Sequence, residues 1–207
     1  MLGVMIVEDS QIAMEYLKTE LSKIKEKYRL QCKLRDAKNV EAACAAGGVD
    51  IVLTEVCLGE VSGLDLGLRI KKRFPRIKVI IMTAMLDRSF LQRAKSYGCD
   101  GFWFKESMHQ GILAILEAVE AGEKVFTEDF PNITIGEAGL EELTEAELAV
   151  LRSFAKGCTY AEVGQDCHIS ENTVRYHVKN LTSKTGMHNM AKIALEAVDK
   201  RVILPRF

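Results

Sequence analysis

The chain has 207 residues, of which 48% are hydrophobic and 28% are charged, a composition that suits one large or two smaller folded domains. Its 28 basic and 29 acidic side chains nearly cancel, so the net charge indicates no class of partner. Six scattered cysteines without a C-x-x-C pair argue against a disulfide scaffold and predict reduced thiols. We expect a cytoplasmic protein that does not associate with membranes, because no long apolar run or signal peptide is found.

Charge is distributed unevenly along the chain. The stretch 121–142 carries 1 basic and 6 acidic side chains, whereas the region before it carries 18 and 16, and the region after it 9 and 7. This acidic stretch separates two regions with different hydrophobic patterns. We therefore predict a first domain at 1–121, a linker at 122–142 and a second domain at 143–207.

The first region alternates short apolar runs with amphipathic stretches. Strands alternating with helices pair in parallel through right-handed crossovers, with helices on both faces of the sheet. The pattern therefore predicts an α/β fold, a flavodoxin-like doubly wound (βα)5 domain. The predicted strands are 4–7, 30–34, 51–56, 79–82 and 102–104, and the predicted helices are 11–27, 40–46, 63–73, 89–96 and 108–121.

Polar residues stand at the carboxyl ends of these predicted strands. Glu8 and Asp9 follow the first strand, Glu55 ends the third, Thr83 the fourth and Lys105 the fifth. Such strand ends share one rim of a parallel sheet, and ligands bind at that rim. Clustered carboxylates suit Mg²⁺, while a lysine and a threonine hydroxyl can hold the oxygens of a phosphoryl group.

Together these motifs resemble the receiver domain of the bacterial two-component response regulators. The resemblance implies that Glu8, Asp9 and the carboxylate of the third strand bind Mg²⁺. It also implies that Thr83 and Lys105 contact a phosphoryl group, and that the aromatic residue Phe102 reports the switch. The matching motifs are Ile6-Val7-Glu8-Asp9-Ser10, residues 50–63, Ile81-Met82-Thr83-Ala84 and Gly101-Phe102-Trp103-Phe104-Lys105.

Position 55 departs from the resemblance, which implies an aspartate that accepts phosphate. Glu55 carries one more methylene, which moves the carboxylate by about 1.5 Å. A misplacement of about 1 Å can slow a reaction that needs alignment roughly a hundredfold. We therefore expect an atypical receiver that acts independently of phosphorylation. Two explanations stay open, namely that Glu55 mimics a phosphoaspartate or that the receiver is degenerate and serves dimerisation alone.

From Leu143 onward the pattern is entirely helical. Two T-x-x-E capping boxes, starting at Thr144 and Thr159, each predict the beginning of a helix, and Ser170 predicts the cap of a third helix over 171–185. A short helix, a tight turn and a helix with a basic outer face indicate a helix-turn-helix. An ordinary helical bundle with a solvated basic face is the alternative. Gly164, inside the short helix, is expected to cost about 1 kcal/mol relative to alanine.

This second region resembles the four-helix DNA-binding domain of the LuxR/FixJ (NarL-type) family. The resemblance implies that the third helix enters the major groove and that the last helix, 189–200, pairs two domains on a palindromic site. Its expected pairing residues are Ile193, Ala194, Ala197 and Val198. The residues that match its DNA contacts are Asn172, Thr173, Arg175, Tyr176 and Lys179. The resemblance rests on Leu143-Thr144, Gly157, Glu162-Val163, Ile169-Ser170, Thr173-Val174-Arg175-Tyr176-His177, Lys184 and Gly186.

The sequence thus predicts a sequence-specific DNA-binding transcription regulator that binds an inverted repeat as a homodimer. The first alternative is a conventional response regulator controlled by phosphorylation from a sensor kinase. The other alternative is an enzyme of phosphoryl chemistry. It is the weaker one, because the third strand lacks the usual nucleophile and the chain lacks a glycine-rich phosphate loop. No catalytic residue is predicted, and the only cofactor considered is Mg²⁺.

Overall fold

The computed structural model describes residues 1–34, 37–59, 61–107, 111–127 and 131–204. The chain divides into two compact units. We call the first the α/β unit and the second the helical unit. Their segments are Met1–Ala84 with Arg88–Phe130, and Met85–Asp87 with Pro131–Phe207.

A parallel sheet in the order β2-β1-β3-β6-β7-β8 forms the centre of the α/β unit. The predicted doubly wound sheet is confirmed, with one strand more than expected. That sixth strand, β8, pairs with β7 and lies inside the stretch predicted as a linker. The strands are Leu2–Val7 (β1), Tyr28–Leu34 (β2), Ile51–Glu55 (β3), Lys78–Thr83 (β6), Gly101–Phe104 (β7) and Val125–Phe126 (β8).

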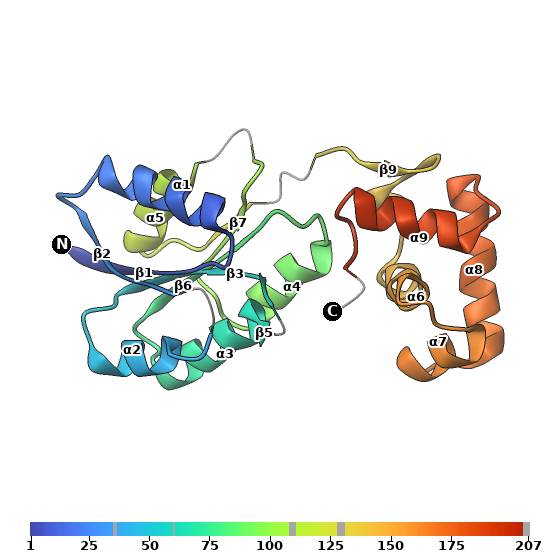
Figure 1. Ribbon diagram of the computed structural model, residues 1–207, viewed down its shortest axis with the longest axis horizontal. Coiled ribbons are helices and arrows are strands. Elements are labelled where there is room, and N and C mark those ends of the chain that lie inside the picture. Colours follow the sequence, from blue (N-terminus) through green and yellow to red (C-terminus); the bar gives the residue numbers. More distant parts are fainter. Residues whose placement is uncertain (35–36, 60, 108–110, 128–130, 205–207) are drawn as a thin grey trace. The chain divides into compact units, whose positions relative to one another are not determined.

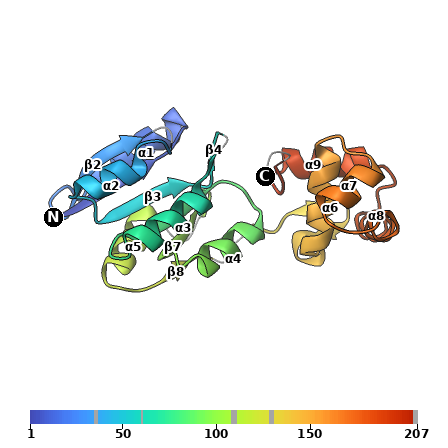
Figure 2. The same ribbon diagram turned by 90° about the horizontal axis from the view of Figure 1, so that it is seen from below.

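Helices cover both faces of this sheet. Figure 1 and Figure 2 show α1 and α5 on one face and α2, α3 and α4 on the other. This arrangement follows from right-handed crossovers between parallel strands. The helices are Gln11–Ser22 (α1), Val40–Ala46 (α2), Gly63–Arg73 (α3), Arg88–Ser96 (α4) and Ile112–Glu120 (α5). The first residues of the predicted 108–121 helix, 108–110, lie outside the described residues.

Helix α1 differs from its prediction in length. It ends at Ser22 instead of residue 27, because the chain turns there to reach β2. The buried residues Met14 and Leu17 face the core. Ile12 and Tyr16 lie on the solvent side of the helix and are 85% and 47% exposed.

A small hairpin follows β3 and leads into α3. It consists of Cys57–Leu58 (β4) and Val61–Ser62 (β5), which the sequence did not predict. Gly63 then passes so close to β3 that a Cβ atom there would lie 1.8 Å from the Glu55 carbonyl oxygen. Glycine is therefore required at the point where α3 begins, directly beside the end of the central strand.

The helical unit contains the four predicted helices. They are Glu145–Ala155 (α6), Tyr160–Asp166 (α7), Glu171–Thr185 (α8) and Met190–Asp199 (α9). Both predicted capping boxes are present. The hydroxyl groups of Thr144 and Thr159 each accept from the backbone N–H three residues on, and the backbone N–H of each threonine donates to the side chain of the glutamate at that position. Ser170 caps α8 as expected, accepting from the Thr173 N–H at 3.1 Å.

The acidic stretch predicted as a linker is largely structured. Thr134–Ile135 (β9) and Ala138–Gly139 (β10) form a hairpin, and Leu140–Glu142 (η1) forms a 3-10 turn. The Glu137 N–H donates to the Thr185 carbonyl at 2.9 Å, which joins the hairpin to the end of α8. The linker prediction was therefore wrong for these residues, because packing on α8 and α9 orders a segment that has no periodicity of its own. Residues 128–130 of the predicted linker lie outside the described residues.

Within the described parts of the chain, no helix is both long enough and apolar enough to cross a membrane.

Candidate functional site

Three of the predicted rim residues meet at the carboxyl end of the sheet. Lys105, which follows β7, lies between two carboxylates: its Nζ is 2.5 Å from Glu8 Oε2 and 2.5 Å from Glu55 Oε2. Glu55 ends β3, and Glu8 follows β1, the neighbouring strand. The parallel order of the strands therefore brings together residues 97 positions apart, and we call this cluster the charged pocket.

Backbone amides hold the remaining carboxylate oxygens of the charged pocket. Glu55 Oε1 accepts from the Val56 N–H at 2.8 Å and the Cys57 N–H at 3.3 Å. Glu8 Oε1 accepts from the Ser10 N–H at 3.0 Å. Because each carboxylate has a cation on one oxygen and amide donors on the other, both are satisfied within the protein.

Burial and charge act in opposite directions on this pocket. Glu8 is 1% exposed and Glu55 is 8% exposed, so both carboxylates are withdrawn from water. Burial raises the pKa of Glu55, and the adjacent Lys105 ammonium opposes that rise. Burial would lower the pKa of Lys105, but the two carboxylates outweigh it and raise that pKa above its usual value.

The other predicted pocket residues occupy different positions. Thr83, at the end of β6, is fully buried beside the pocket strands, and its carbonyl accepts from the Lys105 N–H at 2.8 Å. Phe102 is also fully buried, and its carbonyl accepts from Thr127 Oγ1 at 2.9 Å. Trp103, the next residue, packs in the core formed with α1 and α5. By strand alternation, Phe102 points to the opposite face of the sheet.

The predicted magnesium ligands do not form an open site in this arrangement. Asp9 is exposed, and within the described residues no group of three or more Asp, Glu, His or Cys side chains is placed to hold a metal. The Lys105 ammonium occupies the place between Glu8 and Glu55 where a bridging cation would have to lie. The magnesium site predicted from the sequence would form only if Lys105 moved away from one of these carboxylates.

Helix α8 presents most of the predicted DNA-contact residues to solvent. Its Val174 and Leu181 are fully buried against the rest of the helical unit. The opposite side of the helix carries the polar and basic residues, and Tyr176 is 61% exposed. Of the predicted contact residues, Thr173 is partly buried and the exposed ones are Asn172, Arg175, Tyr176 and Lys179.

Arg175 has two partners that were not predicted from the sequence. Glu171, one helical turn earlier, places its Oε1 2.5 Å from Arg175 Nη2. Tyr160, on α7, lies beneath the guanidinium, whose central carbon is 4.8 Å from the ring centroid. The Glu-to-Arg spacing of four residues could have indicated the first contact, but only the packing of α7 against α8 reveals the second.

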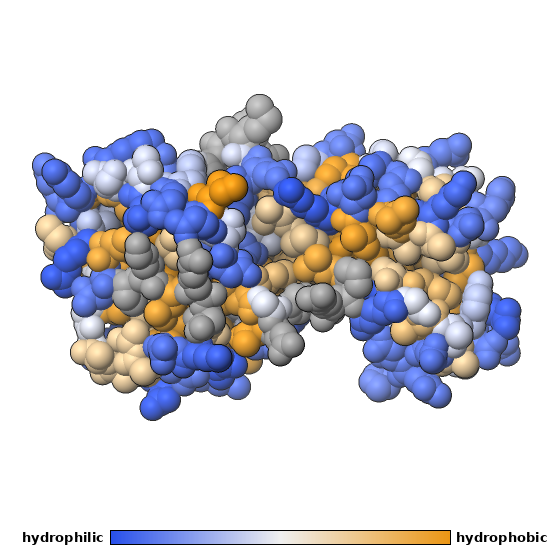
Figure 3. Space-filling model, in the orientation of Figure 1, coloured by the Kyte–Doolittle hydropathy of each residue, from blue (hydrophilic) through white to orange (hydrophobic). Residues whose placement is uncertain are grey.

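Burial in helix α9 shows that some of the expected pairing residues cannot contact a second subunit. Ile193 and Ala197 are fully buried in the core of the helical unit, so they are not available to a second subunit. The other two expected residues, Ala194 and Val198, line a cavity beside α6. Leu195 is a large apolar residue of α9 that is 70% exposed. Figure 3 shows hydrophobic side chains gathered on the surface over α9.

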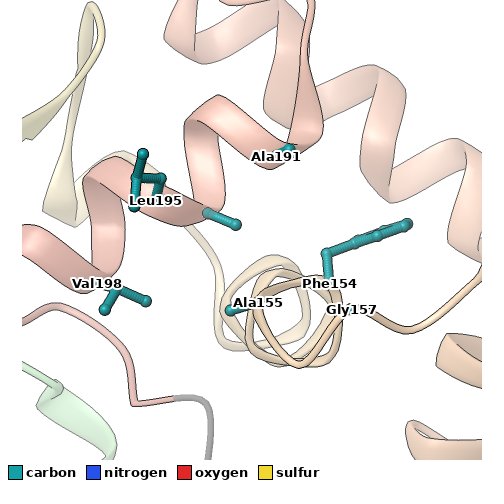
Figure 4. Close-up of a pocket in the computed structure, with 7 residues that line it drawn as sticks. Phe154, Ala155, Gly157, Ala191, Leu195 and Val198 are labelled. Atoms are coloured by element: carbon teal, nitrogen blue, oxygen red, sulfur yellow. The ribbon is translucent and has the colours of Figure 1, made fainter.

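A shallow cavity of about 300 Å³ lies between α6 and α9 on this surface. Figure 4 shows the side chains of Leu195 and Val198 on α9 and of Phe154 on α6 around it. The cavity and the exposed leucine together form an apolar surface, which we call the α9 surface. Its residues are Phe154, Ala155, Gly157, Ala191, Ala194, Leu195 and Val198.

Known proteins show the same organisation. Residues 4–117 match the family described as "Response regulator receiver domain", and residues 141–197 match "Bacterial regulatory proteins, luxR family". The response regulator protein VraR of Staphylococcus aureus is 28% identical over 159 residues, which cover 74% of this chain and 76% of VraR.

Solved structures of RcsB are similar over the whole chain. A structure of two RcsB dimers bound to two parallel DNAs has a TM-score of 0.64 at 20% identity and covers 98% of this chain and 99% of that chain. A structure of RcsB from Salmonella enterica serovar Typhimurium, bound to promoter rprA with the phosphomimetic BeF3-, has a TM-score of 0.62 at 21% identity. It covers 98% of this chain and 100% of that chain. At these identities the likeness supports the fold.

A receiver-type α/β unit joined to a helix-turn-helix unit defines the class of DNA-binding response regulators. The receiver match alone spans more than half of the chain. The chain therefore belongs to the response regulator receiver domain family, and its second unit carries the luxR-type DNA-binding domain. It is a regulator of transcription and not an enzyme.

Proposed function

We propose that this chain regulates transcription by binding a specific DNA sequence as a homodimer, and that its receiver domain acts without phosphorylation of position 55. The observation that carries the proposal is the Lys105 ammonium held between Glu8 and Glu55 at 2.5 Å from each. In the receiver domains that this unit resembles, the lysine at this position contacts a phosphoryl group carried by an aspartate. Here it already contacts the longer carboxylate at the same strand end.

The geometry supports this proposal in two ways. The Glu55 carboxylate uses the Val56 and Cys57 amides and Lys105, which are donors that an added phosphoryl group would need. Lys105 also supplies a positive charge between the two buried carboxylates, which is the electrostatic role of a metal ion. A pocket satisfied in this way has its donors and its cation in place before any phosphate arrives.

Two forms of the proposal remain, and they differ in what Glu55 does. In the first, the carboxylate mimics a phosphoaspartate and holds Lys105 in the active arrangement. In the second, the receiver is degenerate and supports dimerisation alone. The contact between Glu55 and Lys105 is compatible with both forms, because a buried carboxylate needs a cation nearby whether or not it has a signalling role. Conventional control by a sensor kinase is the competing function.

Glu55→Asp tests both the proposal and its two forms. The shorter side chain withdraws the carboxylate by about 1.5 Å, one C–C bond, which releases Lys105 and opens space for a phosphoryl group. After incubation with Mg²⁺ and acetyl phosphate, we expect Glu55→Asp to gain about 80 Da by intact mass, the mass of one phosphoryl group. The wild-type chain should gain nothing, and uptake of phosphate by the wild-type chain at Glu55 would overturn both forms of the proposal.

DNA affinity of the unphosphorylated proteins separates the two forms. A mimic predicts that Glu55→Asp binds DNA more weakly than wild type, by up to the 1–3 kcal/mol typical of a coupling free energy. A degenerate receiver predicts equal affinity. Glu55→Gln serves as the matched control, since it keeps the length of the side chain and removes its charge.

The DNA-binding part of the proposal places α8 in the major groove. Arg175 and Lys179 are exposed on the same side of the helix, and the adjacent Asn172, Thr173 and Tyr176 extend that surface. Bidentate contact with guanine is the usual role of arginine at such a position, whereas lysine commonly contacts phosphate. RcsB dimers bound to DNA have a similar fold, which supports the same mode here.

Pairing of two subunits is proposed for the α9 surface, which presents Leu195 next to an apolar cavity. A two-fold pair uses the same surface on both subunits, so each Leu195 would meet the corresponding surface of the other. A two-fold dimer predicts an inverted-repeat site.

A further inference from the structure

The DNA-facing side of α8 carries a negative charge that the proposed function does not use. Glu171 is the first residue of α8, and its side chain remains 46% exposed. Its carboxylate contacts the Arg175 guanidinium at 2.5 Å. A carboxylate at this position repels the phosphates of DNA, so the simplest expectation is that it weakens binding.

Arg175 is fixed from two directions although it stays accessible. Glu171 contacts one terminal nitrogen, Nη2, from within the same helix. The central carbon of the guanidinium lies over the Tyr160 ring of α7, 4.8 Å from the ring centroid. The Tyr160 ring is itself held by Phe154 of α6 in an edge-to-face contact with 5.2 Å between ring centroids. The Arg175 side chain nevertheless remains 60% exposed.

These contacts restrict the position and the orientation of the guanidinium. The aromatic ring holds the cation over its face, and the carboxylate holds one of its terminal nitrogens. Recognition of guanine needs two parallel N–H groups aimed at two acceptors of one base. An arginine already oriented loses less conformational freedom on binding, which favours the matching base over alternatives.

The carboxylate also affects binding to the wrong DNA. A free arginine at the groove contacts any phosphate, which adds affinity for every sequence. Because Glu171 neutralises Arg175 in the free protein, a phosphate must compete with that carboxylate, whereas a matching base makes two hydrogen bonds in return. The pair therefore lowers sequence-independent affinity more than it lowers affinity for the matching site.

We propose that Glu171 is a specificity-determining residue, which positions Arg175 together with Tyr160 and disfavours its capture by phosphate. This inference rests on the proposed contact between Arg175 and a DNA base. Exposed ion pairs of this kind contribute little to folding stability, so the consequence of the pair lies in binding.

The test compares the affinity of the full-length protein for its selected duplex with that for a random duplex of the same length, at two salt concentrations. For Glu171→Gln we expect affinity for the random duplex to rise and the ratio of the two affinities to fall about tenfold, within the discrimination that one bidentate arginine supplies. If both affinities rise by the same factor, Glu171 acts only as a charge and the proposal is overturned.

Two control variants isolate the contacts. Glu196→Gln removes a glutamate that pairs with Lys200 at 2.6 Å with the same four-residue spacing on α9, and it should leave the ratio unchanged. Tyr160→Phe keeps the ring under Arg175 and should also leave it unchanged, whereas Tyr160→Ala should lower it. Circular dichroism of each variant verifies that the helices are retained.

A double-mutant cycle with Arg175→Ala shows whether Glu171 acts through Arg175. The ratio should not respond to Glu171→Gln when Arg175 is already alanine. A response of unchanged size in that background would overturn the proposal. If Arg175→Ala alone binds both duplexes as the wild type does, Arg175 does not read DNA, which identifies the proposed contact as the failing step.

Discussion

Replacement of Lys105 by methionine should destabilise the α/β unit strongly, in a way that depends on pH. Methionine preserves the length and the apolar stem of the side chain and removes the charge. The variant leaves the carboxylates of Glu8 and Glu55 buried without the cation that lies 2.5 Å from each. Removal of one partner from a buried ion pair costs about 3–5 kcal/mol, and we expect about 3 kcal/mol because the Lys105 side chain is 16% exposed.

The sign of the pH dependence follows from Glu55. Burial raises the pKa of this carboxyl in the folded protein, and in the variant nothing from Lys105 opposes the rise. A folded state with a raised carboxyl pKa binds more protons than the unfolded chain, so stability falls as pH increases from the usual carboxyl range through the folded pKa. The loss of stability relative to wild type should therefore be larger at pH 8 than at pH 5.

Urea unfolding followed by Trp103 fluorescence measures this effect. Trp103 is the single tryptophan of the chain and is 3% exposed in β7, so its signal reports the α/β unit. With a urea dependence of about 2 kcal/mol per molar, a loss of 3 kcal/mol lowers the midpoint by roughly 1.5 M. The double variant with Glu55→Gln should recover part of the loss, because Glu8 still lies buried without its cation.

Lys78→Met is the matched control for the Lys105 experiment. Lys78 is 37% exposed, its Nζ lies 3.4 Å from Asp100, and that carboxylate keeps a second contact with Lys71 at 2.8 Å. Its replacement should cost less than about 1 kcal/mol, as is usual for exposed pairs. The stabilising role of Lys105 in the charged pocket would be refuted if Lys105→Met lost no more stability than this control. It would also be refuted if the stability lost were the same at pH 5 and pH 8.

Other variants test the DNA-binding and pairing surfaces. Replacement of Arg175 and Lys179 by alanine should abolish specific DNA binding in gel-shift assays. The circular dichroism spectrum should stay unchanged, because neither side chain lies in the core. Unchanged DNA affinity would refute the assignment of α8 as the recognition helix. Leu195→Glu should shift the full-length protein toward monomer in sedimentation, and no shift would exclude the α9 surface. Glu147→Gln should cost the helical unit about 1–2 kcal/mol at pH 7, measured by circular dichroism, because it loses a buried charged contact with Lys184 at 2.7 Å. Burial alone would raise the pKa of Glu147, but Lys184 and the Thr144 contacts lower it overall, so its stabilisation should disappear as pH falls through that lowered pKa.

Local rules predicted the elements of both domains well. Alternating apolar runs gave the parallel sheet, and the capping boxes at Thr144 and Thr159 placed the starts of two helices at the observed residues. The same rules failed for residues 134–142, where the hairpin is ordered by packing on α8 and α9 and not by its own pattern. They also failed for Ile193 and Ala197, since an apolar residue on an amphipathic helix gives no sign of whether it faces its own core or another subunit.

Gly164 illustrates how tertiary structure changes the meaning of a residue. From the sequence, glycine inside a helix is expected to destabilise that helix. In the structure a Cβ atom there would lie 2.9 Å from the Ile169 carbonyl oxygen, so glycine allows the turn of the helix-turn-helix to pass close to α7. The glycine that is expected to weaken the helix is therefore what allows the turn to pass close to α7.

The sequence by itself determined which residues stand at the strand ends and that position 55 is glutamate, because strand periodicity and side-chain identity are local properties. Only the tertiary structure decided that Lys105 lies between Glu8 and Glu55 and that Asp9 stays in solvent. The order of parallel strands, set by crossovers far apart in sequence, fixes which ends become neighbours. Burial at that rim then makes the charge balance of three side chains decisive, since buried carboxylates require a cation nearby.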